Sequence, residues 1–510
     1  MKKILSLVLA TATCLACLSG CGEAPAAGNG EAQASVVASA ETNSTADVAA
    51  PAGEVEKVVF LYPGDETDEM ADFVNNQLNP RLAAEAGIEL EIIYRSWDQY
   101  WEQKDVMLAA GQEIDLYWDA LQDLSTIYNK GQCMAIEDLM AEYAPDMLKV
   151  YPESVLIGGR IDGHTYSIPI AFGPSSGTQQ FVCLRQDLLE AVGMTEVKTA
   201  EDLKEYAEKV AEQFPEFRGP ADPIFKPLTR YFADEPYTWI ATPDTVVYGE
   251  NTKKAYDYYE TEAFKKVAQY NANMYAEGLY KDELTTNYNE RDSRMQQGLY
   301  LWVEGSIGKE NEIGASVRGA DPNAVLKSYI LNPDADRYLI TCGTGDAVYV
   351  PASAKNPAGA MKFLNWLYKN QENYLFGLYG DKYEIVDGRL QLEEGFEGYL
   401  YEWMFRNANY IVYTSDVSDE YVEMAKTWDD TAKTSDVIAF HFDNTNVKEI
   451  EASIGEVVKQ YAEPIWTGFL SFDDNYADFM DKLKAAGIDE YIAEVNRQLD
   501  EYFAANGYNN

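Results

Sequence analysis

Val-Glu-Lys-Val-Val-Phe-Leu-Tyr at residues 55–62, followed by Pro63-Gly64-Asp65, opens the folded part of the chain. A run of apolar residues directly before a Pro-Gly turn signal predicts a buried strand. Apolar residues then recur at helical spacing from about Asp68 to Ala86, which predicts a helix. The remaining elements of this alternation are a strand over residues 88–95, a helix over 96–111 that a Ser96 capping box would open, and a strand over 113–118.

This alternation of strands and helices predicts right-handed crossovers and a parallel sheet, and therefore an α/β fold. In a parallel sheet the carboxyl ends of the strands lie at one edge, and ligands bind outside that edge. Tryptophans and acids follow the predicted strands, so we expect them to converge on one rim. The candidate ligand-binding residues there are Asp65, Trp97, Asp98, Trp118 and Asp119.

A structural alternative stays open for the same rim. Ser96 and Asp98 could serve only to cap a helix, and Trp101, one turn later, could belong to the core. Trp97 and Trp118 fit either role.

The amino terminus has the layout of a secretory signal. Lys2 and Lys3 precede an apolar run that ends at Leu18 and is too short to span a membrane. Leu18-Ser19-Gly20-Cys21 resembles the lipobox of bacterial lipoproteins, in which the cysteine thiol receives a diacylglycerol before cleavage on its amino side. The resemblance implies a signal peptide over residues 1–20 and a lipid anchor at Cys21, on the extracytoplasmic face of the cell membrane. The alternative is an ordinary signal peptide that contains Cys21 by chance.

Composition narrows the class of protein further. Residues 21–54 contain no aromatic residue and are rich in Ala, Gly, Ser, Glu and Thr, which predicts a disordered tether. The length of 510 residues predicts two or more domains. A net charge of −45 opposes binding to nucleic acid or to anionic lipid surfaces, because both would be repelled. The cysteines that remain after the anchor are expected to be buried free thiols, namely Cys133, Cys183 and Cys342.

Several later segments together resemble a known family. The Asp162-Gly163 dipeptide predicts a hairpin within residues 160–169, a strand follows at 181–185, and Gln186 begins a helix that ends before Gly193. This succession is similar to the family 1 extracellular solute-binding proteins of ABC importers. The segments that resemble a carboxyl-terminal domain of unassigned function on some of those proteins are residues 439–443, 447–452 and 482–489.

The resemblance implies a two-lobed α/β fold of the type II periplasmic-binding-protein kind, with a mainly helical carboxyl-terminal region. One lobe would comprise residues 55–168 and 346–398, and the other residues 169–345 and 399–510. The chain would cross between them near residues 168–172 and 341–347. The residues expected to face the first-lobe candidates across the cleft are Tyr237, Trp239 and Trp302.

The implied function is capture of a small solute by a monomeric protein that delivers it to the transmembrane subunits of an ABC permease. The 37 Tyr and 9 Trp suit a carbohydrate, because its C–H faces pack on aromatic rings while its hydroxyls bond to polar side chains. Two alternatives stay open, a surface glycoside hydrolase and a peptide- or amine-binding lipoprotein.

Enzyme motifs are weak in this sequence. Residues 173–177 have the G-x-S-x-G spelling of a nucleophile elbow, but a strand-rich stretch follows where a helix should begin. Only His164 and His441 could act as a base. The sequence contains no zinc-type His/Cys spacing, Walker loop or dinucleotide-binding glycine motif, while its 85 acids leave a carboxylate pair of the glycosidase type open. We therefore predict a binding protein rather than an enzyme, without a cofactor or a metal.

Overall fold

A computed structural model describes most of the chain from Val55 onward. The signal, the tether and Cys21 lie outside the described residues, as do Cys342 and parts of both expected crossings. The described ranges are 55–170, 174, 176–177, 180–241, 244–339, 345–393, 396, 398–415 and 417–506. In this part of the chain, no helix is long and apolar enough to cross a membrane.

The first sheet contains the predicted parallel strands. β1 (Glu56–Pro63) pairs in parallel with β2 (Ile88–Arg95) along its whole length and with β3 (Leu116–Ala120) on its other side. β14 (Asp346–Tyr349) and β6 (Ile168–Pro169) extend the sheet in the antiparallel sense, in the order β2-β1-β3-β14-β6. The parallel alternation at the start of the chain is confirmed, and the sheet is completed by a segment more than two hundred residues later.

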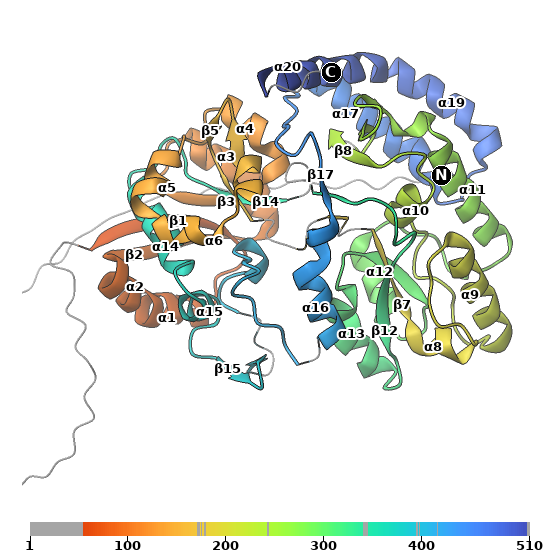
Figure 1. The fold of residues 1–510 in the computed structure, drawn as a ribbon, viewed down its shortest axis with the longest axis horizontal. Coiled ribbons are helices and arrows are strands. Elements are labelled where there is room, and N and C mark those ends of the chain that lie inside the picture. The colour runs from red at the N-terminus through yellow and green to blue at the C-terminus, as the bar shows by residue number, and fades with distance from the viewer. Residues whose placement is uncertain are drawn as a thin grey trace, which may run out of the picture. The chain divides into compact units, whose positions relative to one another are not determined.

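Helices cover this sheet (Figure 1). The helix expected over residues 68–86 is interrupted by a π-helical turn, and Gly87 ends it with a positive φ of 70°. Ser96 occupies the N-cap of the next helix, but its side chain makes no capping hydrogen bond, so the expected capping box is wrong. The helices of this part are α1 (Asp68–Phe73), α2 (Asn79–Ala86), α3 (Trp97–Ala109), α4 (Leu124–Asn129), α5 (Glu137–Tyr143), α6 (Pro145–Val150), α7 (Glu153–Leu156), α14 (Pro357–Leu367) and α15 (Gln371–Tyr379).

Two hairpins also belong to this part. β4 (Arg160–Ile161) and β5 (His164–Thr165) flank Asp162 and Gly163, both with positive φ, as the dipeptide predicts. The second hairpin pairs β15 (Tyr383–Val386) with β16 (Arg389–Leu392).

The middle of the chain forms two antiparallel sheets. In one, β7 (Phe181–Arg185) lies between β11 (Trp302–Gly305) and β12 (Leu326–Ile330). In the other, β9 (Val246–Gly249) lies between β8 (Tyr237–Ala241) and β10 (Ala255–Asp257). The accompanying helices are α8 (Gln186–Ala191), α9 (Ala200–Gln213), α10 (Lys226–Tyr231), α11 (Glu262–Ala276), α12 (Tyr288–Met295) and α13 (Lys309–Ala320).

The carboxyl-terminal region is mainly helical, as predicted. The short β17 (Lys433–Thr434) pairs with β13 (Tyr338–Leu339) before the last helices begin. Ile454, Val495 and Leu499, which the helical spacing places on apolar faces, are buried. Figure 1 shows the last of these helices in blue beside β8 and α11, whereas the first of them lies beside α13. They are α16 (Asp419–Thr427), α17 (Lys448–Val457), α18 (Glu463–Trp466), α19 (Phe472–Ala485) and α20 (Ile488–Ala505).

The buried apolar residues fall into two large cores. The first core draws on residues 58–170 and 347–405, and the second on residues 182–331 and 437–503. Leu400 and Phe405 belong to the first core, although the division expected after residue 398 would assign them to the second lobe. The segment that contributes to the first core therefore extends beyond residue 398, to at least Phe405.

Candidate functional site

A group of aromatic rings lies at the carboxyl ends of β1, β2 and β3. Trp97 and Trp101 stand one helical turn apart at the start of α3, directly after β2. Trp118 belongs to β3. Tyr401 and Trp403 come from the last part of the chain that packs on the first core. We call these residues, Trp97, Trp101, Trp118, Tyr401 and Trp403, the tryptophan cluster.

Trp118 is the centre of the tryptophan cluster. Its ring centroid lies 5.6 Å from that of Trp97, 5.3 Å from that of Trp101 and 5.5 Å from that of Trp403, each in an edge-to-face arrangement. Trp118 is only 5% exposed, whereas Trp97 is 38% and Trp101 48% exposed. The buried ring thus supports two outer rings that are partly exposed to solvent, and the alternative in which Trp101 belongs to the core is excluded.

A stack of rings anchors the other side of the cluster. Tyr401 lies parallel to Tyr62 of β1 at 5.3 Å and to Trp403 at 5.4 Å. Gly64, with φ of 127°, permits this approach, because a Cβ there would lie 2.9 Å from the Tyr401 hydroxyl oxygen. Tyr401 and Trp403 were not predicted to belong to the site, although the aromatic alternation Tyr-Leu-Tyr-Glu-Trp at residues 399–403 was a signal for them.

The acids of the rim fall into two kinds. Asp65 and Asp98 are exposed, after β1 and in the first turn of α3. Asp119 is buried, and its carboxylate forms an ion pair with Lys104 and accepts a hydrogen bond from the Ala120 amide. Burial raises the pKa of Asp119, and Lys104 offsets part of that rise. Asp119 therefore holds β3 to α3 and is not free to bind a solute as the sequence suggested.

Asp346 is a further acid of this region, which the sequence did not predict. It begins β14 and pairs with Ala120 across the sheet, next to the end of β3. Burial raises its pKa to about 6, while the indole N–H of Trp118 and the charge of Arg406 act in the opposite direction.

The candidates from the middle of the chain do not all come together. Tyr237 and Trp239 lie on β8 with their rings edge to face at 5.6 Å. Trp302 is fully buried on β11, where its ring packs 6.1 Å from that of Tyr206 on α9. Because a helix covers the face on which Trp302 lies, this tryptophan is a core residue and not a ligand-binding one.

Trp239 lines a pocket that we call the Trp239 pocket. The pocket has about 640 Å³ of atom-free space, part of it open to solvent. Besides Trp239, its polar lining includes Gln122 and Asp123 from the link between β3 and α4, and His441, Asn444 and Glu451 from the carboxyl-terminal region.

His441 lines this pocket and forms hydrogen bonds to two segments from the first part of the chain. Its Nε2 lies 2.6 Å from the Gly158 carbonyl oxygen, and its own carbonyl accepts a hydrogen bond from the Ser125 hydroxyl at 3.2 Å. Burial lowers the pKa of His441 to about 4, so the imidazole is neutral at pH 7. Because a carbonyl can only accept, Nε2 carries the proton.

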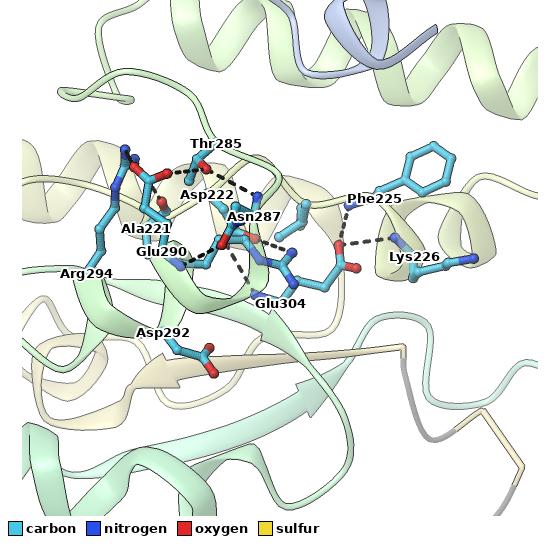
Figure 2. A network of polar contacts seen from close by, with 12 residues as sticks. Ala221, Asp222, Phe225, Lys226, Thr285, Asn287, Glu290, Asp292, Arg294 and Glu304 are labelled. Atoms are coloured by element: carbon cyan, nitrogen blue, oxygen red, sulfur yellow. Dashed lines mark hydrogen bonds and ion pairs between the residues drawn. The ribbon is translucent and has the colours of Figure 1, made fainter. Parts of the chain in front are cut away.

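A buried polar network fixes the helix beside Trp239 (Figure 2). Asp222 pairs with Arg291 at 2.7 Å and accepts from the Glu304 amide at 3.4 Å. The Glu304 carboxylate in turn accepts from the amides of Phe225 and Lys226, which open α10. The network therefore positions Lys226, whose Nζ lies 4.5 Å from the centroid of the Trp239 ring.

Within the G-x-S-x-G stretch at residues 173–177, Ser176 forms hydrogen bonds that hold neighbouring segments together. The hydroxyl and the amide of Ser176 both donate to Asp429, and the indole of Trp428 donates to the Ser176 carbonyl. His164 pairs with Glu137, and Ser175, the central serine of the motif, lies outside the described residues. Among the residues that the structure describes, no group of His, Cys, Asp or Glu is placed to hold a metal ion.

Two family models match the chain. The model described as bacterial extracellular solute-binding protein matches residues 77–377, and a domain of unknown function (DUF3502) matches residues 437–504. A curated relative from Streptococcus pneumoniae, named carbohydrate ABC transporter substrate-binding protein, is 26% identical over 89% of this chain and 92% of its own length.

Solved structures share the fold. An N-glycan transport solute-binding protein from Streptococcus pneumoniae has a TM-score of 0.74 at 20% identity, covering 88% of this chain and 99% of that one. A solute-binding protein from Bifidobacterium longum infantis, titled as binding HMO, has a TM-score of 0.60 at 16% identity, covering 88% and 99%. The predicted fold class, type II with a mainly helical carboxyl-terminal region, is confirmed.

Proposed function

The chain belongs to the bacterial extracellular solute-binding proteins, and we propose that it captures an oligosaccharide and delivers it to the permease of an ABC importer. The family consists of binding proteins, so the prediction of a binding protein rather than an enzyme holds. Support for a carbohydrate comes from the name of the curated relative and from solved relatives titled as complexes with Man5GlcNAc, kestose and fructo-nystose.

The observation that carries the proposal is the exposure of Trp97 and Trp101 on a rim of the first sheet. Exposed tryptophans held rigidly by a buried third one are suited to the apolar C–H faces of a sugar. Asp65 and Asp98 on the same rim could accept hydrogen bonds from hydroxyl groups. We assign these four side chains to the sugar site, with Trp118 as their support.

We propose two lobes built on the two cores. The first lobe comprises residues 55–168 and 346–405, extended from 398 because the first core includes Phe405. The second lobe is built on residues 182–331 and 437–503, because Ile170 still belongs to the first core and Tyr410 and Val412 pack against that core. A solute that contacts both lobes would favour their closure, because only the closed state makes both sets of contacts.

The membrane attachment is part of the same proposal. The lipobox resemblance at residues 18–21 supports a diacylglycerol on Cys21 and removal of residues 1–20. Residues 21–54 would then act as a tether that holds a monomeric binding protein at the extracytoplasmic face of the membrane. The permease subunits there would receive the solute.

A thermal-shift screen tests the proposed class of solute. The probes are Man1GlcNAc, Man5GlcNAc, kestose, fructo-nystose, a tripeptide and spermidine, each at several concentrations. We expect at least one oligosaccharide to raise Tm progressively, since a ligand at a hundred times its Kd stabilises the folded state by about 2.7 kcal/mol. A rise with the tripeptide or spermidine and with none of the carbohydrates would contradict the proposal.

A further inference from the structure

The carboxyl-terminal domain of unknown function contributes to the Trp239 pocket. The domain begins near Val437, and its segment from Phe440 to Asn444 lines the pocket together with Glu451 on α17. The opposite lining comes from Gln122 and Asp123, which directly follow the strand that carries Trp118. The domain thus lies next to the link that leads from the tryptophan cluster.

His441 ties this domain to the elements of the first lobe. The hydrogen bonds of His441 to Gly158 and Ser125 join a residue of the matched domain to two places on the first-lobe chain. Both partners lie far from His441 in sequence, and His441 itself lines the pocket. The segment is therefore held in place even though it has no regular secondary structure of its own.

The chemistry of the pocket fits a neutral polyhydroxyl group. The Trp239 ring supplies an apolar surface, and Asp123 and Glu451 supply acceptors. The Glu451 carboxylate accepts hydrogen bonds from the side-chain amide of Asn444 and from the hydroxyl of Tyr491. The carboxylates of Asp123 and Glu451 repel each other. Hydroxyl groups of a ligand that donate hydrogen bonds to them would reduce this repulsion, whereas an anionic sugar would itself be repelled.

Lys226 does not cancel the negative charge that Asp123 and Glu451 give to the pocket. Its Nζ pairs with Asp244 at 2.5 Å while lying over the Trp239 ring, so the two charges compensate each other at the edge of the pocket. The remaining acceptors keep the pocket negative overall.

We propose that the carboxyl-terminal domain is part of the solute site, and that the Trp239 pocket binds a neutral sugar unit of an oligosaccharide whose other end lies on the tryptophan cluster. This inference rests on the proposed function, because it requires a carbohydrate of several units. It assigns to the domain a role in selecting the length and the charge of the solute.

Titration calorimetry with a short and a long member of one series tests the inference, using Man1GlcNAc against Man5GlcNAc and kestose against fructo-nystose. The variants are Trp239→Ala, its milder form Trp239→Phe, and Glu451→Gln. Glu456→Gln, on an exposed position of α17, is the matched control. Urea unfolding of each variant reports whether the fold is intact.

We expect Trp239→Ala and Glu451→Gln to weaken binding of the longer member about tenfold or more and that of the shorter member less than threefold. Glu456→Gln should bind both members like the wild type. Equal binding of the longer member by wild type and both pocket variants would overturn the inference, and so would an equal loss for both members. If Trp239→Ala does not fold, Trp239→Phe and Glu451→Gln decide. Failure of the wild type to bind any oligosaccharide would instead reject the proposed function itself.

Discussion

The indole ring of Trp118 stands at 86° to that of Trp97, with the ring centroids 5.6 Å apart. A buried ring therefore packs against an exposed one in an edge-to-face arrangement. This relationship separates two roles that the sequence left combined, because Trp118 is buried while Trp97 is partly exposed to solvent. A ligand would meet the outer ring, and the stability of the rim would depend on the inner one.

Replacing Trp118 should therefore cost stability. We expect Trp118→Ala to lower the free energy of unfolding by about 3 kcal/mol or more, as for other buried tryptophans. Urea denaturation without ligand measures this loss, and Trp97→Ala is the matched control, for which we expect a loss below about 1 kcal/mol. Unchanged stability of Trp118→Ala would mean that Trp118 lines the cleft instead of supporting it.

The ion pair between Lys104 and Asp119 gives a second prediction. Lys104→Met should lower the free energy of unfolding by about 3–5 kcal/mol, because it leaves a buried carboxylate without its partner. Lys130→Met removes an exposed pair with Asp105 and should cost less than about 1 kcal/mol. Urea denaturation measures both losses in the free energy of unfolding. Similar losses in the two variants would show that the buried Lys104 pair contributes no more to stability than the exposed pair.

Asp257 should make stability depend on pH. Burial raises its pKa to about 7 in the folded protein, well above its value near 4 in an unfolded chain. The folded state thus binds the proton more tightly, and the contribution of this group is fully present below about pH 4 and is lost as the pH rises through 7. Asp257→Asn should be more stable than the wild type by about 2–4 kcal/mol at pH 8 and nearly equal to it at pH 4.

Urea unfolding at pH 4, 6 and 8 measures this difference between Asp257→Asn and the wild type. Asp381→Asn, at an exposed position, should follow the wild-type curve at every pH. An Asp257→Asn curve parallel to that of the wild type would contradict the assignment.

The anchor can be tested at Cys21. Cys21→Ala should leave an uncleaved precursor that incorporates no labelled fatty acid, because the thiol that accepts the lipid is absent. Cys17→Ala, within the same signal, should be processed normally. Gel mobility and fatty-acid labelling in cells measure both, and a Cys21→Ala product with the size and the lipid of the mature protein would rule the anchor out.

Local patterns predicted the elements that local forces determine. The parallel pairing of β1, β2 and β3 follows from short apolar runs separated by helical spacing. The hairpin of β4 and β5 forms around Asp162-Gly163, as the dipeptide predicts. The buried faces of α17 and α20 likewise follow from their periodicity. In each of these cases, residues close in sequence carry the signal.

Contacts between distant segments could not be predicted in the same way. Tyr401 and Trp403 join the cluster because β14 and the helices after it return the chain to the first sheet. The burial of Trp302 depends on α9 lying over β11, and the loss of Asp119 as a ligand depends on the side chain of Lys104. An aromatic or an acid at the end of a strand looks the same in sequence whether a helix covers it or leaves it open.

Titration calorimetry of the mature protein with the oligosaccharide panel, carried out in parallel on the Trp97→Ala/Trp101→Ala variant, tests the central claim most directly. We predict saturable one-to-one binding of at least one oligosaccharide by the wild type. The double variant should bind it about a hundredfold more weakly, since each lost ring contact of about 1.4 kcal/mol is a factor of ten. Equal affinities in the two proteins, or no binding of any carbohydrate by the wild type, would contradict the account.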